Sequence, residues 1–196
     1  MSDISSLKKF IDGTDPDSGL LYQSYVNSLY RYGISLGFAE DICMDAIHDV
    51  FCKLYNLSKE NIIKIENVKY YLFKSLKHRL FDIYKKNKFI ENVSITSIPF
   101  DIEVSVVDPI IDEEDKKIIT EKVESLMSCL TDRQKEGIYL RYIQEMNYDE
   151  IALLLNMTPK SARMLVFRAM ERLRNLNGDE KKIFFILLSA SFLKSL

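Results

Sequence analysis

The stretch that decides the fold is YDEIALLLNMTPKSARMLVFRAMERLR, residues 148–174. Apolar residues recur at helical spacing in its first part. Asn156 follows at a bend that needs a positive φ, which Asn adopts more readily than other residues that have a side chain. Thr158 and Pro159 are typical of an N-cap followed by the first residue of a second helix. The pattern predicts a helix-turn-helix.

The second of these helices is expected to have two different faces. Apolar residues predicted to pack inward are Ala162, Leu165, Val166, Ala169 and Leu173. The outer face is expected to carry Lys160, Ser161, Arg163, Phe167 and Arg168. Three cations, a hydroxyl and a ring suit contacts with phosphates and with the major groove of DNA. An ordinary solvated hairpin with a basic face is the alternative interpretation.

Length and charge indicate two units rather than a single basic domain. The 196 residues are 47% apolar and carry a net charge of −2, so only local charge favours nucleic acid. Residues 69–91 hold seven cations against two carboxylates, and residues 158–174 hold five against one. Seven carboxylates and no cation lie between them, in residues 101–115. This distribution predicts two nucleic-acid-facing units joined by an acidic linker.

No catalytic, metal or cofactor site is expected. The cysteines (Cys43, Cys52 and Cys129) are neither paired nor spaced as zinc ligands, and His48 and His78 add no cluster, so buried reduced thiols are predicted. The sequence contains no nucleophile–base pair and no phosphate loop, which argues against an enzyme and against a small-molecule substrate. A signal peptide and a membrane span are also absent from the pattern, so we expect a cytoplasmic protein.

Few glycines and prolines and a helical periodicity predict an all-α fold of two small helical domains. Helices are expected at residues 39–56, 68–88 and 132–142, the last of them capped by Thr131, after a first apolar stripe of Leu21, Tyr25, Leu29 and Tyr32. Tyr71 and Phe81 are expected to point into the core. The predicted divisions are a first domain at 1–88, a linker at 89–115, a second domain at 116–177 and an apolar extension at 178–196.

Residues 130–174 closely resemble region 4 of bacterial sigma factors. The matching positions are Leu130, Arg133 and Gln134, then Leu140, Arg141 and Tyr142, then Tyr148, Glu150, Ile151 and Ala152. The segments AEDICMDAIHDVFCKLY (39–55) and VKYYLFKSLKHRLFDIYKK (68–86) resemble region 2 of the same family. The linker is too short for a region 3 domain, so the chain resembles the extracytoplasmic-function (ECF) sigma factors.

That resemblance implies an initiation factor that binds core RNA polymerase, through the β′ clamp and the β flap, and promoter DNA. The residues implied for the −35 element are Lys160, Ser161, Arg163, Phe167 and Arg168. Those implied for the −10 element, where cations and interleaved rings hold an opened strand, are Lys74, Lys77, His78, Arg79, Lys85 and Lys86. The implied contact with the clamp is the charged stripe of Asp41, Asp45, Asp49 and Lys53. An anti-sigma factor is a further expected partner.

Two rival interpretations remain. A stand-alone helix-turn-helix regulator would bind duplex DNA tightly without polymerase. A helical adaptor that binds only protein would tolerate alanine at Arg163 and Arg168. The apolar extension at 178–196 is interpreted either as an extra helix covering the second domain or as a segment that docks between the domains or on a partner and controls access to DNA.

Overall fold

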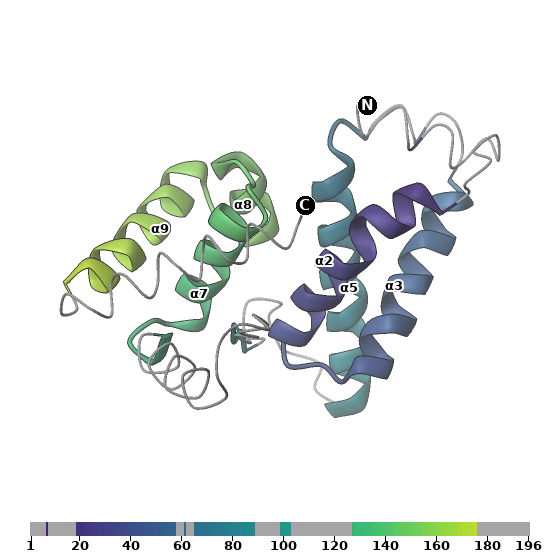
Figure 1. The fold of residues 1–196 in the computed structure, drawn as a ribbon, viewed down its shortest axis with the longest axis horizontal. Coiled ribbons are helices and arrows are strands. Elements are labelled where there is room, and N and C mark those ends of the chain that lie inside the picture. The colour runs from purple at the N-terminus through teal and green to yellow at the C-terminus, as the bar shows by residue number, and fades with distance from the viewer. Residues whose placement is uncertain are drawn as a thin grey trace, which may run out of the picture. The chain divides into compact units, whose positions relative to one another are not determined.

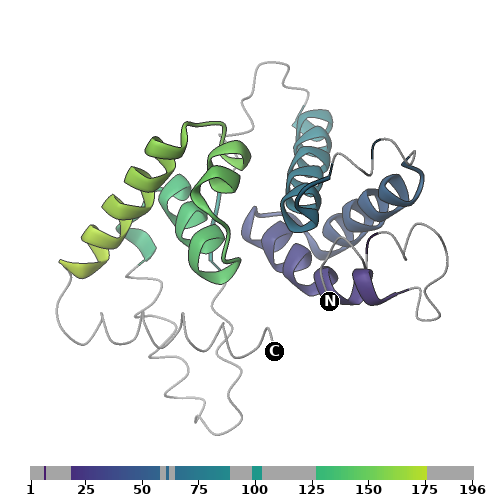
Figure 2. The same ribbon diagram turned by 90° about the horizontal axis from the view of Figure 1, so that it is seen from above.

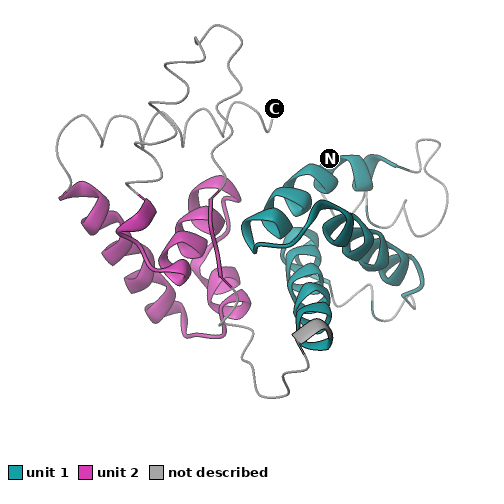
Figure 3. Cartoon of the chain, turned by 90° about the horizontal axis from the view of Figure 1, so that it is seen from below, with its two compact units in different colours: residues 1–98 teal, residues 99–196 magenta. Residues whose placement is uncertain are grey.

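The structure is a computed structural model that describes residues 7, 19–57, 61, 65–88, 99–102 and 127–175. All regular structure in these ranges is helical, as the periodicity predicts (Figure 1). The chain divides into two compact units, Met1–Ile98 and Pro99–Leu196 (Figure 3). This division lies within the predicted linker at 89–115. Across the described ranges, no helix combines the length and the apolar character needed to cross a membrane.

Three described helices form the core of the first unit. They are α2 (Leu20–Ser35), α3 (Glu40–Tyr55) and α5 (Val68–Lys88), and each packs against the other two (Figures 1 and 2). The apolar stripe predicted for α2 is confirmed, because its members are all buried: Leu21, Tyr25, Leu29 and Tyr32. Burial of such side chains supplies the main driving force for the packing of amphipathic helices.

The crossing of α2 and α3 depends on Gly33, which lies inside α2. A Cβ atom added at Gly33 would lie 2.7 Å from the Sγ of Cys43 on α3. Cys43 is fully buried, so the thiol has little room to move away. The absence of a side chain at Gly33 therefore allows the two helices to approach closely.

The ring that enters the core from α5 is Phe73 rather than the two predicted rings. Phe73 is 0% exposed, and its centroid lies 5.1 Å from that of Tyr32. Tyr71 and Phe81 are half-buried, so the prediction that they point into the core is confirmed only in part. Phe73 precedes Leu76 by three residues, which places it on the same face of the helix, whereas Tyr71 precedes Leu76 by five.

The second unit is built around α9. Its described elements are α7 (Asp132–Ile138), η2 (Tyr139–Ile143), α8 (Tyr148–Leu154) and α9 (Pro159–Arg174). The last of these packs on α7 and on α8 (Figure 2). Gly137 brings α7 close to α9, because a Cβ there would lie 3.1 Å from the Cδ2 of Leu165.

One predicted helix of this unit is divided in two. Residues 132–142 were expected to form a single α-helix, but from Tyr139 onward the chain forms the π-helical turn η2. The N–H of Gln144 donates to the carbonyl of Tyr139 at 3.0 Å, which is the five-residue spacing of a π-helix. The wider turn is a local bulge that the apolar periodicity does not reveal.

Capping boxes begin α7 and α8 of the second unit. The predicted cap at Thr131 is confirmed: its side chain accepts from the N–H of Gln134, whose own side chain accepts from the N–H of Thr131. Asn147 and Glu150 form the same reciprocal arrangement at the start of α8, at 2.9 and 2.8 Å. Each box satisfies N–H groups that the first turn of a helix leaves unpaired.

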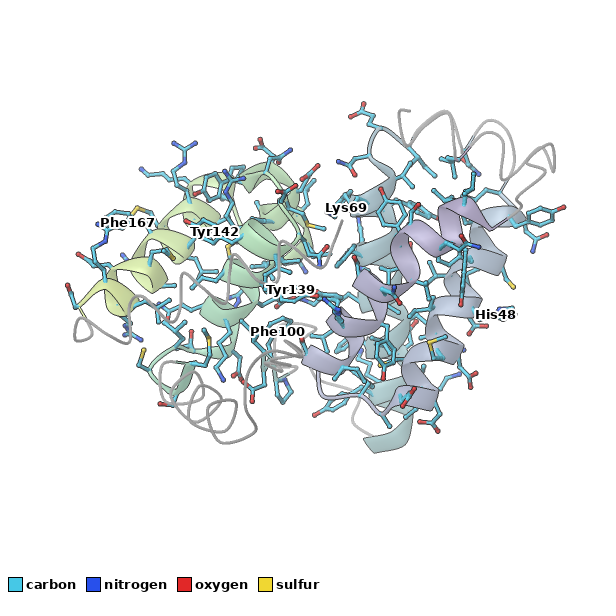
Figure 4. All side chains as sticks on the ribbon, in the orientation of Figure 1. His48, Lys69, Phe100, Tyr139, Tyr142 and Phe167 are labelled. Carbon is cyan, nitrogen blue, oxygen red and sulfur yellow. The ribbon has the colours of Figure 1, made fainter. Side chains whose placement is uncertain are left out.

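Part of the predicted linker is anchored on the second unit. Phe100 is 1% exposed, and its ring packs edge-on against Tyr139 with centroids 5.5 Å apart (Figure 4). The carboxylate of Asp101 accepts from the Nζ of Lys135 at 2.8 Å. Residues 99–102 are not helical. Residues 99–102 therefore form an irregular segment that docks on the second unit.

Candidate nucleic-acid interface

The bend of the helix-turn-helix has the predicted geometry. Asn156 has φ 53°, in the left-handed region where a positive φ was expected. Arg133 of α7 reinforces the bend, because its Nη2 donates to the carbonyl of Leu155 at 2.7 Å. Thr158 then caps α9 by accepting from the N–H of Ser161, and Pro159 is the first helical residue. The orientation of α9 is thus fixed on both sides of the bend.

The inner face of α9 also follows the prediction. Its buried residues are Ala162, Val166, Ala169 and Leu173. Leu165, also predicted inward, is half-buried and lies against Gly137. Ala152 on α8 is 1% exposed, and α8 packs against α9. Small residues on both helices allow this close crossing.

The outer face of α9, called the recognition face below, consists of Lys160, Ser161, Arg163, Phe167 and Arg168. All five residues are exposed. Phe167 is the most unusual of them, since this large apolar ring is 55% exposed at the outer side of α9 (Figure 4). The hydroxyl of Ser161 lies 2.9 Å from that of Thr158, which ties it to the helix N-terminus. The geometry therefore brings together every residue that the sequence assigned to this surface.

Arg141 and Tyr148 lie beside the recognition face, and neither was singled out as a site residue from the sequence. The guanidinium carbons of Arg141 and Arg163 lie 4.9 and 5.2 Å from the centroid of the Tyr148 ring. Burial and the neighbouring phenol of Tyr148 raise the pKa of Tyr142, against the opposing effect of Arg141. These residues come from three elements, so only their places in the family motif hinted that they belong together.

The basic surface of the first unit lies along α5. Lys74 and Lys86 are exposed, as is His78. Two of the predicted cations lie over aromatic rings one helical turn earlier. The Nζ of Lys74 is 5.5 Å from the centroid of Tyr70, and that of Lys85 is 4.9 Å from the centroid of Phe81. The predicted interleaving of cations and rings is present on this helix.

Lys77 does not belong to that surface. It is 2% exposed, whereas the sequence analysis placed it among the DNA-facing cations. The reason is its helical register: Lys77 follows Phe73 by four residues and precedes Leu80 by three, so all three share the buried face. Its long methylene stem fits such an apolar environment.

The charged stripe on α3 is exposed at Asp41, Asp45 and Lys53. Asp49 is half-buried instead, and its Oδ2 accepts from the Nε of Arg79 on α5 at 2.7 Å. One residue implied for polymerase and one implied for DNA therefore bind each other. Their separation of 30 positions in the sequence explains why the pairing was not expected.

The three cysteines have different environments. Cys43 is buried, and desolvation together with the nearby carboxylate of Asp41 raises the pKa of its thiol from 9.0 to about 11. Cys129 is half-buried, and Cys52 is exposed, with its Sγ 3.4 Å from the Nε2 of His48 on the outside of α3 (Figure 4). The prediction of buried thiols is wrong for Cys52.

Comparison with known proteins adds two findings to this geometry. Residues 120–173 match the family model described as Sigma-70, region 4, a segment that contains the whole recognition face. The chain is also 27% identical over 157 residues to the ECF RNA polymerase sigma factor SigM of Bacillus subtilis (strain 168). That similarity covers 80% of this chain and 92% of the relative, and so extends well beyond the second unit.

Proposed function

We propose that this chain, which belongs to the ECF group of the sigma-70 family, directs RNA polymerase to promoters in the bacterial cytoplasm. The observation that carries the proposal is the recognition face on α9, whose five residues are all exposed, within the segment that matches sigma-70 region 4. The proposed role is one of binding and positioning. Each unit has its own part in this proposal.

The second unit reads the −35 element. In helix-turn-helix proteins the N-terminal residues of the second helix contact base edges while the first helix crosses the backbone. Arg163 and Arg168 have the planar fork that forms two bonds with the O6 and N7 of guanine. Phe167 suits the methyl group of thymine. Lys160 and Ser161, in the first turn of α9, are placed for phosphate contacts, because helix N-termini attract anions.

The first unit holds the −10 element through α5. Lys74, His78 and Lys86 are exposed for contacts with strand phosphates. The half-buried rings of Tyr70 and Phe81, beside cations on the same helix, provide surfaces on which an unpaired base can stack. Because Lys77 is buried, this proposed surface has one cation fewer than the sequence implied.

The contact with the β′ clamp is proposed for the exposed residues of α3, Asp41, Asp45 and Lys53. Asp49 takes part only by exchanging its partner Arg79 for a cation of polymerase. Partly exposed ion pairs contribute no more than about 1 kcal/mol, so such an exchange costs little. Contacts with the β flap and with an anti-sigma factor complete the proposal, and the extension at 178–196 lies outside the described residues.

The proposal is tested by transcription in vitro with core polymerase over a library of promoter fragments. Arg163→Ala and Arg168→Ala are each expected to reduce discrimination at one −35 base pair by about fivefold or more, because a good bidentate contact is worth about 1–3 kcal/mol. Arg174→Ala is the matched control: it removes an exposed cation from the last turn of the same helix. If the chain binds duplex DNA tightly without polymerase, and directs no initiation when polymerase is present, the result would favour a stand-alone regulator.

A further inference from the structure

The ring of Tyr148 connects the recognition face to the scaffold behind it. Tyr148 is the first residue of α8, and the guanidinium groups of Arg141 and Arg163 both lie over its ring, at 4.9 and 5.2 Å. Cations within about 6 Å of a ring centroid are attracted by the negative face of the ring. The two arginines thus share one aromatic partner, although they come from η2 and from α9.

The two arginines differ in how they are held. The Nη1 of Arg141 donates to the carbonyl of Met146 at 2.8 Å, and the side chain is half-buried. Arg141 and Tyr148 therefore belong to the fixed corner between η2 and α8. Arg163 is exposed, and its guanidinium lies over the ring of Tyr148. The corner supplies a rigid support for a side chain that otherwise has many rotamers.

We propose that Tyr148 is a positioning residue that orients the guanidinium of Arg163 toward one guanine of the −35 element. This inference rests on the proposed function, and it deepens it. A guanidinium that lies over a ring uses its face, which leaves the N–H groups at its edge available for a bidentate contact. The second cation, Arg141, makes this corner more positive, and this favours the two acceptors of guanine, O6 and N7.

Orientation is what separates this role from simple phosphate binding. A phosphate contact needs only a positive charge nearby, whereas a bidentate base contact needs the planar fork held at a defined angle. Loss of the Tyr148 ring leaves the charge of Arg163 unchanged. The expected consequence is a loss of base discrimination with little change in the salt dependence of DNA binding, which reports the number of neutralised phosphates.

The test uses holoenzyme formed from the full-length chain and core polymerase on a panel of single-base −35 variants. Arg163→Ala first identifies the base pair that Arg163 reads. Tyr148→Leu is expected to reduce discrimination at that same base pair from about fivefold or more to within about twofold. Tyr148→Phe, which keeps the ring, is expected to retain the wild-type ratio. The slope of log affinity against log salt should stay the same in all Tyr148 variants.

A purely structural role for Tyr148 predicts something else. Discrimination would then fall at every position alike, or Tyr148→Phe and Tyr148→Leu would behave the same, and either result would overturn the inference. Tyr148→Met replaces Tyr148→Leu if thermal melting shows that the latter fails to fold. Wild-type holoenzyme that selects no promoter defeats the proposed function together with this inference. Normal selection by wild type and an unaltered ratio in Tyr148→Leu defeat this inference alone.

Discussion

Alanine in place of Gly33 tests the packing of the first unit. The added Cβ would lie 2.7 Å from the Sγ of Cys43 and 3.6 Å from the Cδ1 of Leu80, and both neighbours are 0% exposed. Overpacking of a buried site costs about 1–3 kcal/mol. Replacement of a helical glycine by alanine contributes about 0.5–1 kcal/mol in the opposite direction. We therefore expect the free energy of unfolding to fall by about 1 kcal/mol.

A double-mutant cycle separates the clash from the helix propensity. Cys43→Ala removes the Sγ atom, and in that background Gly33→Ala should stabilise the protein by up to about 1 kcal/mol. Urea unfolding followed by circular dichroism at 222 nm measures the four free energies, since the chain has no tryptophan. The reasoning is refuted if Gly33→Ala destabilises both backgrounds equally, because the thiol would then not be the atom that resists the new methyl group.

Three further outcomes concern Phe100, Asn147 and Cys43. Phe100→Ala should lower the unfolding free energy of the second unit by about 3 kcal/mol in urea, whereas the exposed control Phe167→Ala should change it by less than about 0.5 kcal/mol. Asn147→Ala should cost about 1 kcal/mol and speed hydrogen exchange at the first turn of α8; unchanged exchange would argue against the capping box. The folded state holds the Cys43 proton up to a pKa of about 11 rather than 9.0. The protonated Cys43 thiol therefore makes its full contribution to the free energy of unfolding below pH 9. That contribution, about 2–3 kcal/mol, is lost as the pH rises through 11. Urea unfolding of wild type and Cys43→Ala between pH 8 and pH 11 measures this loss. A difference in unfolding free energy between the two proteins that does not change with pH would contradict the prediction.

Local signals predicted the helix-turn-helix well. A turn or an N-cap depends on residues within about four positions, so Asn156, Thr158 and Pro159 carried the information themselves. The same holds for Thr131, whose reciprocal partner is only three residues away. The exposure of the recognition face followed from helical spacing alone, because a strongly amphipathic helix has one way to bury its apolar side.

Contacts between helices could not be predicted from the sequence. Phe73 and Lys77 lie on the buried face of α5. The apolar residues of this helix are spaced so that the sequence did not determine which face would be buried. The ion pair of Asp49 with Arg79 joins helices 30 positions apart, and each residue looked solvent-facing on its own helix. The π-helical turn at Tyr139 has no distinctive composition. Such features depend on how helices meet, which periodicity does not determine.

The most direct measurement of the central claim is promoter-directed initiation in vitro by the cognate core polymerase, with and without this chain. Specific transcripts are expected only when both are present, with start sites that depend on a −35 sequence contacted by Arg163 and Arg168. Absence of specific initiation, together with absence of binding to core polymerase, would contradict the account.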